Sequence, residues 1–109
     1  MTTAPPKWIS ATNRPPNKDL LIRYMTEDGK PALCFAFPFF GLRDPWQSAF
    51  VKCQSLGRDA LSKRELRHLM EADLDSVEHT RVIRWVVELG EWRSRYIAPG
   101  AVTHWMEAG

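Results

Sequence analysis

The sequence predicts an α+β fold: a small twisted antiparallel sheet of four or five strands, with barrel-like closure as one option, and two short helices inserted after the second strand. Runs of β-branched and aromatic residues near both ends of the chain are typical of strands. In the middle, apolar residues recur at intervals of three and four, which is typical of helices. The Asp28-Gly29 pair between two apolar runs is a strong hairpin signal.

The N-terminal region is expected to hold little regular structure. Residues 1–7 are small and Pro-rich, and we expect them to form a flexible leader. Trp8 and Ile9 then begin a single domain over residues 8–109. Asn and Pro residues fill 10–18, so this stretch is expected to be a loop.

A β-hairpin follows this loop. Its first strand is expected over Leu20–Met25 and its second over Ala32–Phe37, with the turn at residues 27–30. Pro38 has no N–H to donate to a strand ladder. The second strand is therefore expected to end there.

The middle of the chain predicts two helices, near 45–55 and 63–72. Asp44 is expected to cap the first, with Pro at the first helical position, and Gly57 is well placed to end it. Ser62-Lys63-Arg64-Glu65 has the pattern of a capping box, which places the start of the second helix.

The last third of the chain returns to strand-like composition. Three Val and one Ile over residues 82–87 favour a strand. A helix is the alternative, because helical spacing is kept by Val82, Trp85, Val86 and Leu89. Further strands are expected over Trp92–Ile97 and Val102–Met106, with tight turns between them.

Composition favours a globular cytoplasmic protein. The formal net charge of +2 is too small to indicate nucleic-acid binding, although Arg outnumbers Lys by ten to five. Five Trp, five Phe and two Tyr are many for 109 residues and can build a core or a contact surface. No window is apolar enough to span a membrane. Cys34 and Cys53 lie on apolar faces, so both are expected to be free, buried and unreactive in a bacterial cytoplasm.

No pattern of catalytic or cofactor-binding residues is recognisable. The three His and two Cys lack the spacing of a zinc site, no Ser lies in a nucleophile-elbow pattern, and the glycines stand apart at turns. We therefore expect no metal, no cofactor and no enzymatic activity. His104 is expected to be structural, donating to a backbone carbonyl, with a binding contact as the alternative.

The candidate binding residues lie in the last third of the chain. Basic and aromatic residues alternate there, and the set consists of Arg84, Trp92, Arg93, Arg95 and Tyr96. In a strand, Arg93 and Arg95 would share one face, and Trp92 and Tyr96 the other. Such a pattern fits an ordinary half-buried strand, a protein-binding surface or a surface that stacks single-stranded nucleic acid. A second basic run around Arg64 and Arg67 is typical of a solvated helix face.

Short motifs near the two ends of the chain give an indication of its biological setting. Trp8-Ile9, a Pro-rich turn and the apolar Leu20-Leu21-Ile22 begin the chain, and Val102-Thr103-His104-Trp105-Met106 stands near its end. This order resembles a family of small phage and prophage proteins known as domain of unknown function 551, over roughly a third of the chain.

The resemblance implies a phage or prophage setting and no established chemistry. It leads us to expect a non-enzymatic accessory protein in the bacterial host cell that binds a host or phage protein. Inhibition of a host enzyme or defence complex, in the manner of an anti-CRISPR protein, is the role that such a setting implies. The alternative is a nucleic-acid-binding module that uses the Arg and aromatic strands.

Overall fold

The structure, a computed structural model, describes residues 7–107 and divides into two compact units. One unit combines the chain up to Phe39 with the chain from Val82 onward, and the other is Phe40–Arg81. The predicted leader lies outside the described residues except for Lys7, which is exposed. The single domain over 8–109 stays a prediction.

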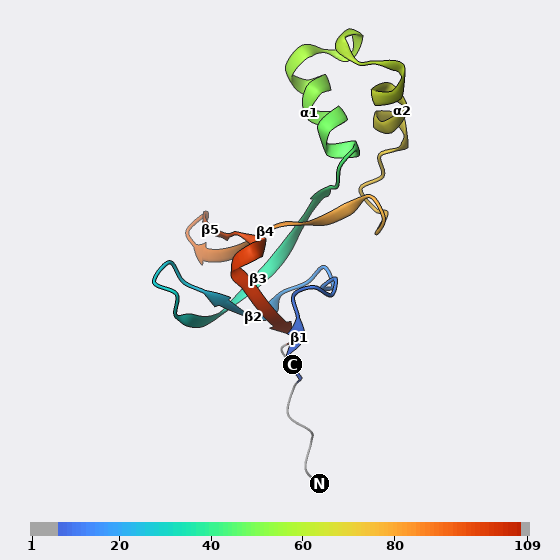
Figure 1. Cartoon of the computed structure of the whole chain (residues 1–109). Coiled ribbons are helices and arrows are strands. Elements are labelled where there is room, and N and C mark those ends of the chain that lie inside the picture. Colours follow the sequence, from blue (N-terminus) through green and yellow to red (C-terminus); the bar gives the residue numbers. More distant parts are fainter. Residues whose placement is uncertain (1–6, 108–109) are drawn as a thin grey trace. The chain divides into compact units, whose positions relative to one another are not determined.

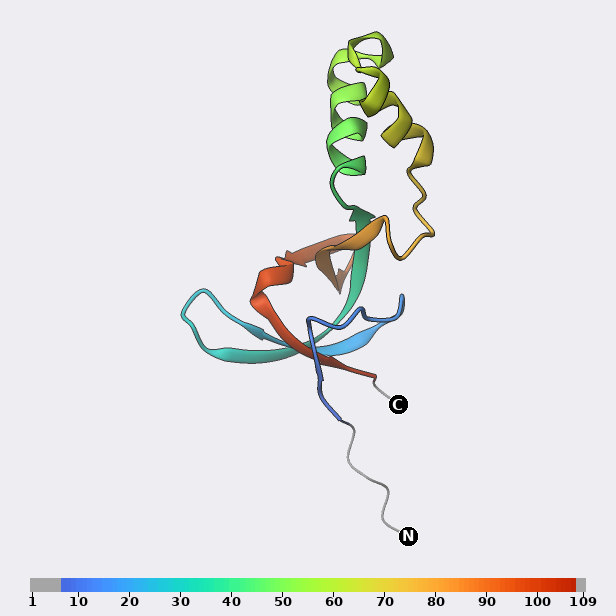
Figure 2. The ribbon, with the colours of Figure 1, turned by 45° about the vertical axis from the view of Figure 1, so that its right-hand side comes forward.

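The α+β class is confirmed, with one antiparallel sheet and two helices. The sheet has six strands in the order β1-β6-β2-β3-β4-β5, one more than the upper expectation, and it is not closed into a barrel. Figures 1 and 2 show its strong twist. The strands are β1 (Ile9–Ser10), β2 (Leu20–Met25), β3 (Pro31–Leu42), β4 (Thr80–Gly90), β5 (Arg93–Ile97) and β6 (Val102–Met106).

The hairpin between β2 and β3 is confirmed, with its turn where Asp28-Gly29 predicts it. Leu20 pairs with Ala36, and Met25 pairs with Pro31. Gly29 has φ 77°, a left-handed conformation that glycine adopts without steric cost. Local turn chemistry thus explains the predicted position of the turn.

The expected end of the second strand at Pro38 is wrong, because β3 continues to Leu42 with Pro38 buried inside it. The pairing with β2 ends at Ala36, opposite the first residue of β2. Pro38 therefore lies beyond the β2 ladder, and its missing N–H costs no hydrogen bond to that neighbour.

The core lies on one face of the twisted sheet and draws on five of its strands. It consists of Leu20, Ile22, Tyr24, Ala36, Trp85, Ile97, Val102 and Trp105. Trp105 keeps only 6% of its surface exposed, and its indole Nε1 donates to the Asn13 carbonyl at 3.3 Å. That hydrogen bond fastens the loop before β2 to the last strand.

The motifs at the two ends of the chain predict that Trp8 and Trp105 are both largely buried and close in space, and the structure confirms the burial of Trp105 but not that of Trp8. Ile9 pairs with Trp105, so the two ends of the chain do meet in the sheet. Trp8, however, is only half-buried, and its ring meets the edge of His104 at a centroid distance of 6.4 Å. Strand β1 has only two residues, so its edge position leaves the preceding side chain partly in solvent.

The strand reading of residues 82–87 is confirmed, since they lie inside β4. Trp92–Ile97 is shorter than expected, because β5 begins at Arg93 and Trp92 lies in the turn before it.

The second unit contains two helices that lie side by side, α1 (Trp46–Leu56) and α2 (Lys63–Glu71) (Figure 2). A short 3-10 helix, Arg58–Ala60, lies between the two helices. A second 3-10 helix, Pro99–Ala101, belongs to the other unit and precedes β6. Gly57 ends α1 with φ 86°, as predicted. The exposed apolar side chains of this unit include Phe50, Val51, Leu56, Met70, Leu74 and Val77.

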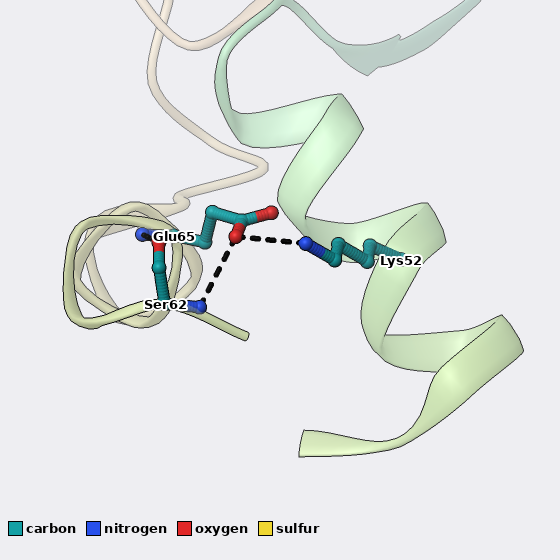
Figure 3. Close-up of polar contacts among 3 residues, drawn as sticks. All are labelled: Lys52, Ser62 and Glu65. Atoms are coloured by element: carbon teal, nitrogen blue, oxygen red, sulfur yellow. Dashed lines mark hydrogen bonds and ion pairs between the residues drawn. The ribbon is translucent and has the colours of Figure 1, made fainter. Parts of the chain in front are cut away.

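The capping box at Ser62 is confirmed and also links the two helices (Figure 3). The Ser62 hydroxyl accepts from the Glu65 amide at 3.1 Å, and the Glu65 carboxylate accepts from the Ser62 amide at 3.1 Å. The same carboxylate oxygen accepts from Lys52 of α1 at 2.9 Å. These contacts, with the Lys52 hydrogen bond as the largest cause, lower the pKa of Glu65 to about 2.

The expectation that Asp44 caps α1 is wrong. The N-cap position belongs to Pro45, and no side chain caps the first turn. Asp44 lies one residue too early, and its carboxylate instead accepts from the Ser48 hydroxyl at 2.6 Å. The first turn is held by backbone bonds such as that from the Gln47 amide to the Arg43 carbonyl.

Cys34 and Cys53 are free, as expected, but both are half-buried and not fully enclosed. Cys34 alternates with the outward side chains of β3 and packs against the core. Burial raises the pKa of its thiol, and the charge of Arg95 opposes this effect in part. The raised pKa disfavours the reactive thiolate.

Candidate functional site

The tip of the β4–β5 hairpin presents a fully exposed tryptophan in a strained turn. Gly90 has φ 78°, Glu91 φ 53° and Trp92 φ 64°. Positive φ at both central residues is typical of the type I′ hairpin turn, whose twist matches that of the flanking strands. Asn and Gly usually occupy these two positions. For residues with a Cβ, each such conformation costs on the order of 1 kcal/mol. Trp92 has a relative exposure of 106%, so no packing in the described chain offsets this cost.

Beside this hairpin, the sheet face opposite the core carries exposed aromatic side chains. We call it the aromatic face, and it comprises Leu33, Phe35, Phe37, Phe39, Arg84 and Tyr96. Strict alternation along β3 turns the Leu and Phe residues outward and leaves Ala36 and Pro38 buried. Phe35 and Tyr96 are each 61% exposed. Apolar surface gathered in this way is typical of an interaction site.

Arg84 is a cation held within the aromatic face by two rings. Its guanidinium carbon lies 4.5 Å from the centroid of Phe39 and 4.9 Å from that of Tyr96. Its Nε atom is buried without a hydrogen-bond partner, and no carboxylate among residues 7–107 forms an ion pair with it. The side chain is therefore oriented by cation–π contacts and keeps donors for an external acceptor.

The five residues predicted from the sequence do not form one surface. Arg84 and Tyr96 meet on the aromatic face, and Trp92 stands at the hairpin tip. Arg93 is also at the tip, with a guanidinium nitrogen 3.8 Å from a carboxylate oxygen of Glu91. Arg95 lies on the opposite face.

The position of Arg95 follows from the hairpin register. Arg95 pairs with Val87, which packs against the core, and its guanidinium lies 5.8 Å from the Tyr24 ring. The register shifts between Glu88 and Gly90, so the alternation expected for a strand beginning at Trp92 does not hold at the tip.

Sequence reasoning missed the β3 contribution to this site. Phe35 and Phe39 belong to a run in which every second residue is Leu or Phe. That alternation was a usable signal, because one side of a half-buried strand is normally polar. A strand with large apolar residues outward and small ones inward indicates a binding face.

A small groove lies in the aromatic face and carries negative charge. Its volume is about 190 Å³, and it is lined by Asp19, Phe35, Ala36, Phe37, Val86 and Glu88. Val86 pairs with Tyr96, so the groove borders the ring that stacks on Arg84. The aromatic face therefore combines apolar surface with charges of both signs.

His104 does not make the expected bond to a backbone carbonyl. Within the described chain, its Nδ1 atom is buried without a hydrogen-bond partner, and its ring packs edge-on against Trp8. Among residues 7–107, no group of three or more His, Cys, Asp or Glu side chains could hold a metal ion.

Comparisons with family models, with curated proteins and with solved structures find no match to this chain. The resemblance of its two ends to the phage family stays a prediction. None of the described helices combines the length and apolar character needed to cross a membrane.

Proposed function

We propose that this protein is a non-enzymatic binding protein that recognises another protein through the aromatic face and the Trp92 hairpin tip. The setting that we propose is the cytoplasm of a bacterial host, where the chain acts as a phage or prophage accessory protein. Inhibition of a host enzyme or defence complex is the proposed outcome of binding. The setting rests on the motifs at the two chain ends, and the mode of action rests on the surface.

The observation that carries the proposal is Arg84 held by Phe39 and Tyr96, in the same β4–β5 hairpin whose tip exposes Trp92 fully. Trp, Tyr and Arg are the residue types that most often contribute 2 kcal/mol or more at protein interfaces. A preoriented Arg loses little side-chain freedom on binding, which favours affinity. An exposed Trp in a strained turn is difficult to explain by folding stability.

Charge favours a protein partner over nucleic acid. Phosphate binding needs cations that neutralise a backbone, and the aromatic face offers Arg84 next to a groove flanked by Asp19 and Glu88. Carboxylates at that position would repel phosphates, whereas a protein can present acidic and basic side chains to match both signs.

Capture of host proteins by the full chain tests the proposal. Trp92→Ala and Tyr96→Ala should each weaken capture at least about tenfold, in line with interface hot spots. The matched control is Lys30→Ala, which lies at the tip of the other hairpin. Circular dichroism should show that all three variants fold.

The same capture separates the partner classes. Recovery that survives nuclease treatment and depends only weakly on salt supports a protein partner. Loss of recovery with nuclease, or a steep linear fall of log affinity with log salt, would instead identify nucleic acid. Full-strength capture by both aromatic variants would remove this face from the proposal.

A further inference from the structure

We propose that the groove in the aromatic face receives a lysine or arginine side chain of the partner protein. The inference rests on the proposed function, because it assigns chemistry to part of the same face. It concerns the groove lined by Asp19, Phe35–Phe37, Val86 and Glu88.

The lining of the groove matches the two parts of a long basic side chain. Phe35, Phe37 and Val86 supply apolar surface, along which the methylene stem of Lys or Arg can pack. Asp19 and Glu88 supply carboxylates for the charged end. The exposed Phe35 ring also offers a face for a cation–π contact.

Both carboxylates are free to bind a cation from outside the chain. Neither Asp19 nor Glu88 forms an ion pair with any residue of the described range 7–107. Lys18, the sequence neighbour of Asp19, pairs with Glu107 at 2.9 Å. Arg84, on the same face, is held by Phe39 and Tyr96.

Other occupants fit this lining less well. A purely apolar side chain would desolvate two carboxylates and return no hydrogen bond, which is unfavourable. A phosphate or an acidic side chain would be repelled. A basic side chain is the occupant that matches both the apolar and the acidic residues of the lining.

A titration of the full isotope-labelled chain with N-acetyl-lysine-N-methylamide tests the groove without needing the partner. The backbone amide signals of Phe35–Phe37 and Val86–Glu88 should shift saturably. The neutral analogue N-acetyl-norleucine-N-methylamide keeps the four-carbon side chain and lacks the ammonium group, so it should bind roughly fivefold more weakly, the ratio expected from one exposed ion pair. The double variant Asp19→Asn, Glu88→Gln should bind both amides equally.

Several outcomes would overturn the inference. These are equal binding of both amides to the unaltered chain, unchanged lysine selectivity in the folded double variant, and shifts confined to other parts of the sheet. The inference would also be overturned if neither ligand caused a saturable shift. The same holds if inorganic phosphate shifted the backbone amide signals of the groove residues more strongly than the lysine amide does. Because the titration uses no partner protein, its result is independent of the capture experiment. The groove proposal can be wrong while capture through Trp92 and Tyr96 is observed, and the groove can bind the lysine amide while capture is not observed.

Discussion

Two tryptophans in this chain should differ strongly in how much the same substitution lowers the stability of the protein. Trp105 is 6% exposed and hydrogen-bonded through its indole nitrogen, whereas Trp92 is fully exposed in a turn. Trp105→Ala should therefore destabilise the protein strongly, and Trp92→Ala should leave its stability nearly unchanged. The pair separates the structural aromatics from those that we assign to binding.

The magnitude follows from the buried area. A buried Trp removes about 200 Å² from water, which at about 25 cal/mol per Å² gives an upper limit of about 5 kcal/mol. Alanine keeps the Cβ, but the substitution leaves a cavity and an unpaired Asn13 carbonyl. A loss of about 3–5 kcal/mol is expected for Trp105→Ala, against less than about 0.5 kcal/mol for Trp92→Ala.

Urea unfolding followed by circular dichroism measures both free energies. Trp105→Phe serves as a milder variant in case Trp105→Ala does not fold, and it should lose about half as much stability. Trp92→Gly should raise stability by up to about 1 kcal/mol, because glycine removes the steric cost of the positive φ.

Equal losses of stability at the two positions would contradict the different burial of Trp105 and Trp92. A Trp105→Ala cost below about 1 kcal/mol would mean that the indole is not part of the core. A Trp92→Ala cost above about 2 kcal/mol would mean that the exposed ring has a structural role, which would also weaken its assignment to binding.

The remaining predictions concern the helical unit and the thiol in the sheet. Ser62→Ala should lower the free energy of unfolding by about 1 kcal/mol, because it removes the cap of α2. Asp44→Ala removes no cap and should lower it by less than about 0.5 kcal/mol. Equal losses of the two variants in urea unfolding would contradict the cap assignment. The Glu65 carboxylate has a folded pKa of about 2, below its ordinary value of 4.5, so its stabilisation is complete above pH 4.5 and disappears as the pH falls toward 2. The stability difference between the natural chain and Glu65→Gln should therefore shrink over that range in acid titrations, and a constant difference would argue against the Lys52 contact. Cys34, with its raised pKa, should react with a maleimide at pH 7 more slowly than a free thiol, and labelling at the free-thiol rate would show that burial does not protect it.

Local chemistry made much of the fold predictable from the sequence. The Asp-Gly turn, the box at Ser62 and the glycine stop at Gly57 each depend on a few neighbouring residues, and the structure contains all three. Two local rules failed because they depend on the exact position of a residue. Asp44 lies one residue before the N-cap of α1. Pro38 lies two residues beyond the last residue of β3 that pairs with β2. The β-branched composition of 82–87 was likewise sufficient to choose strand over helix.

The aromatic face depended on tertiary structure. Arg84, Phe39 and Tyr96 come from three strands, and only the order and register of the sheet bring a cation between two rings. Strand alternation already predicts that Arg95 and Tyr96 point to opposite faces, and the register of β5 against β4 decides that Arg95 shares the face of the core. The sequence of one strand determines which of its side chains share a face. Contacts between side chains of different strands depend on which strands pair, on their register and on bulges, and these are decided only when the whole sheet forms.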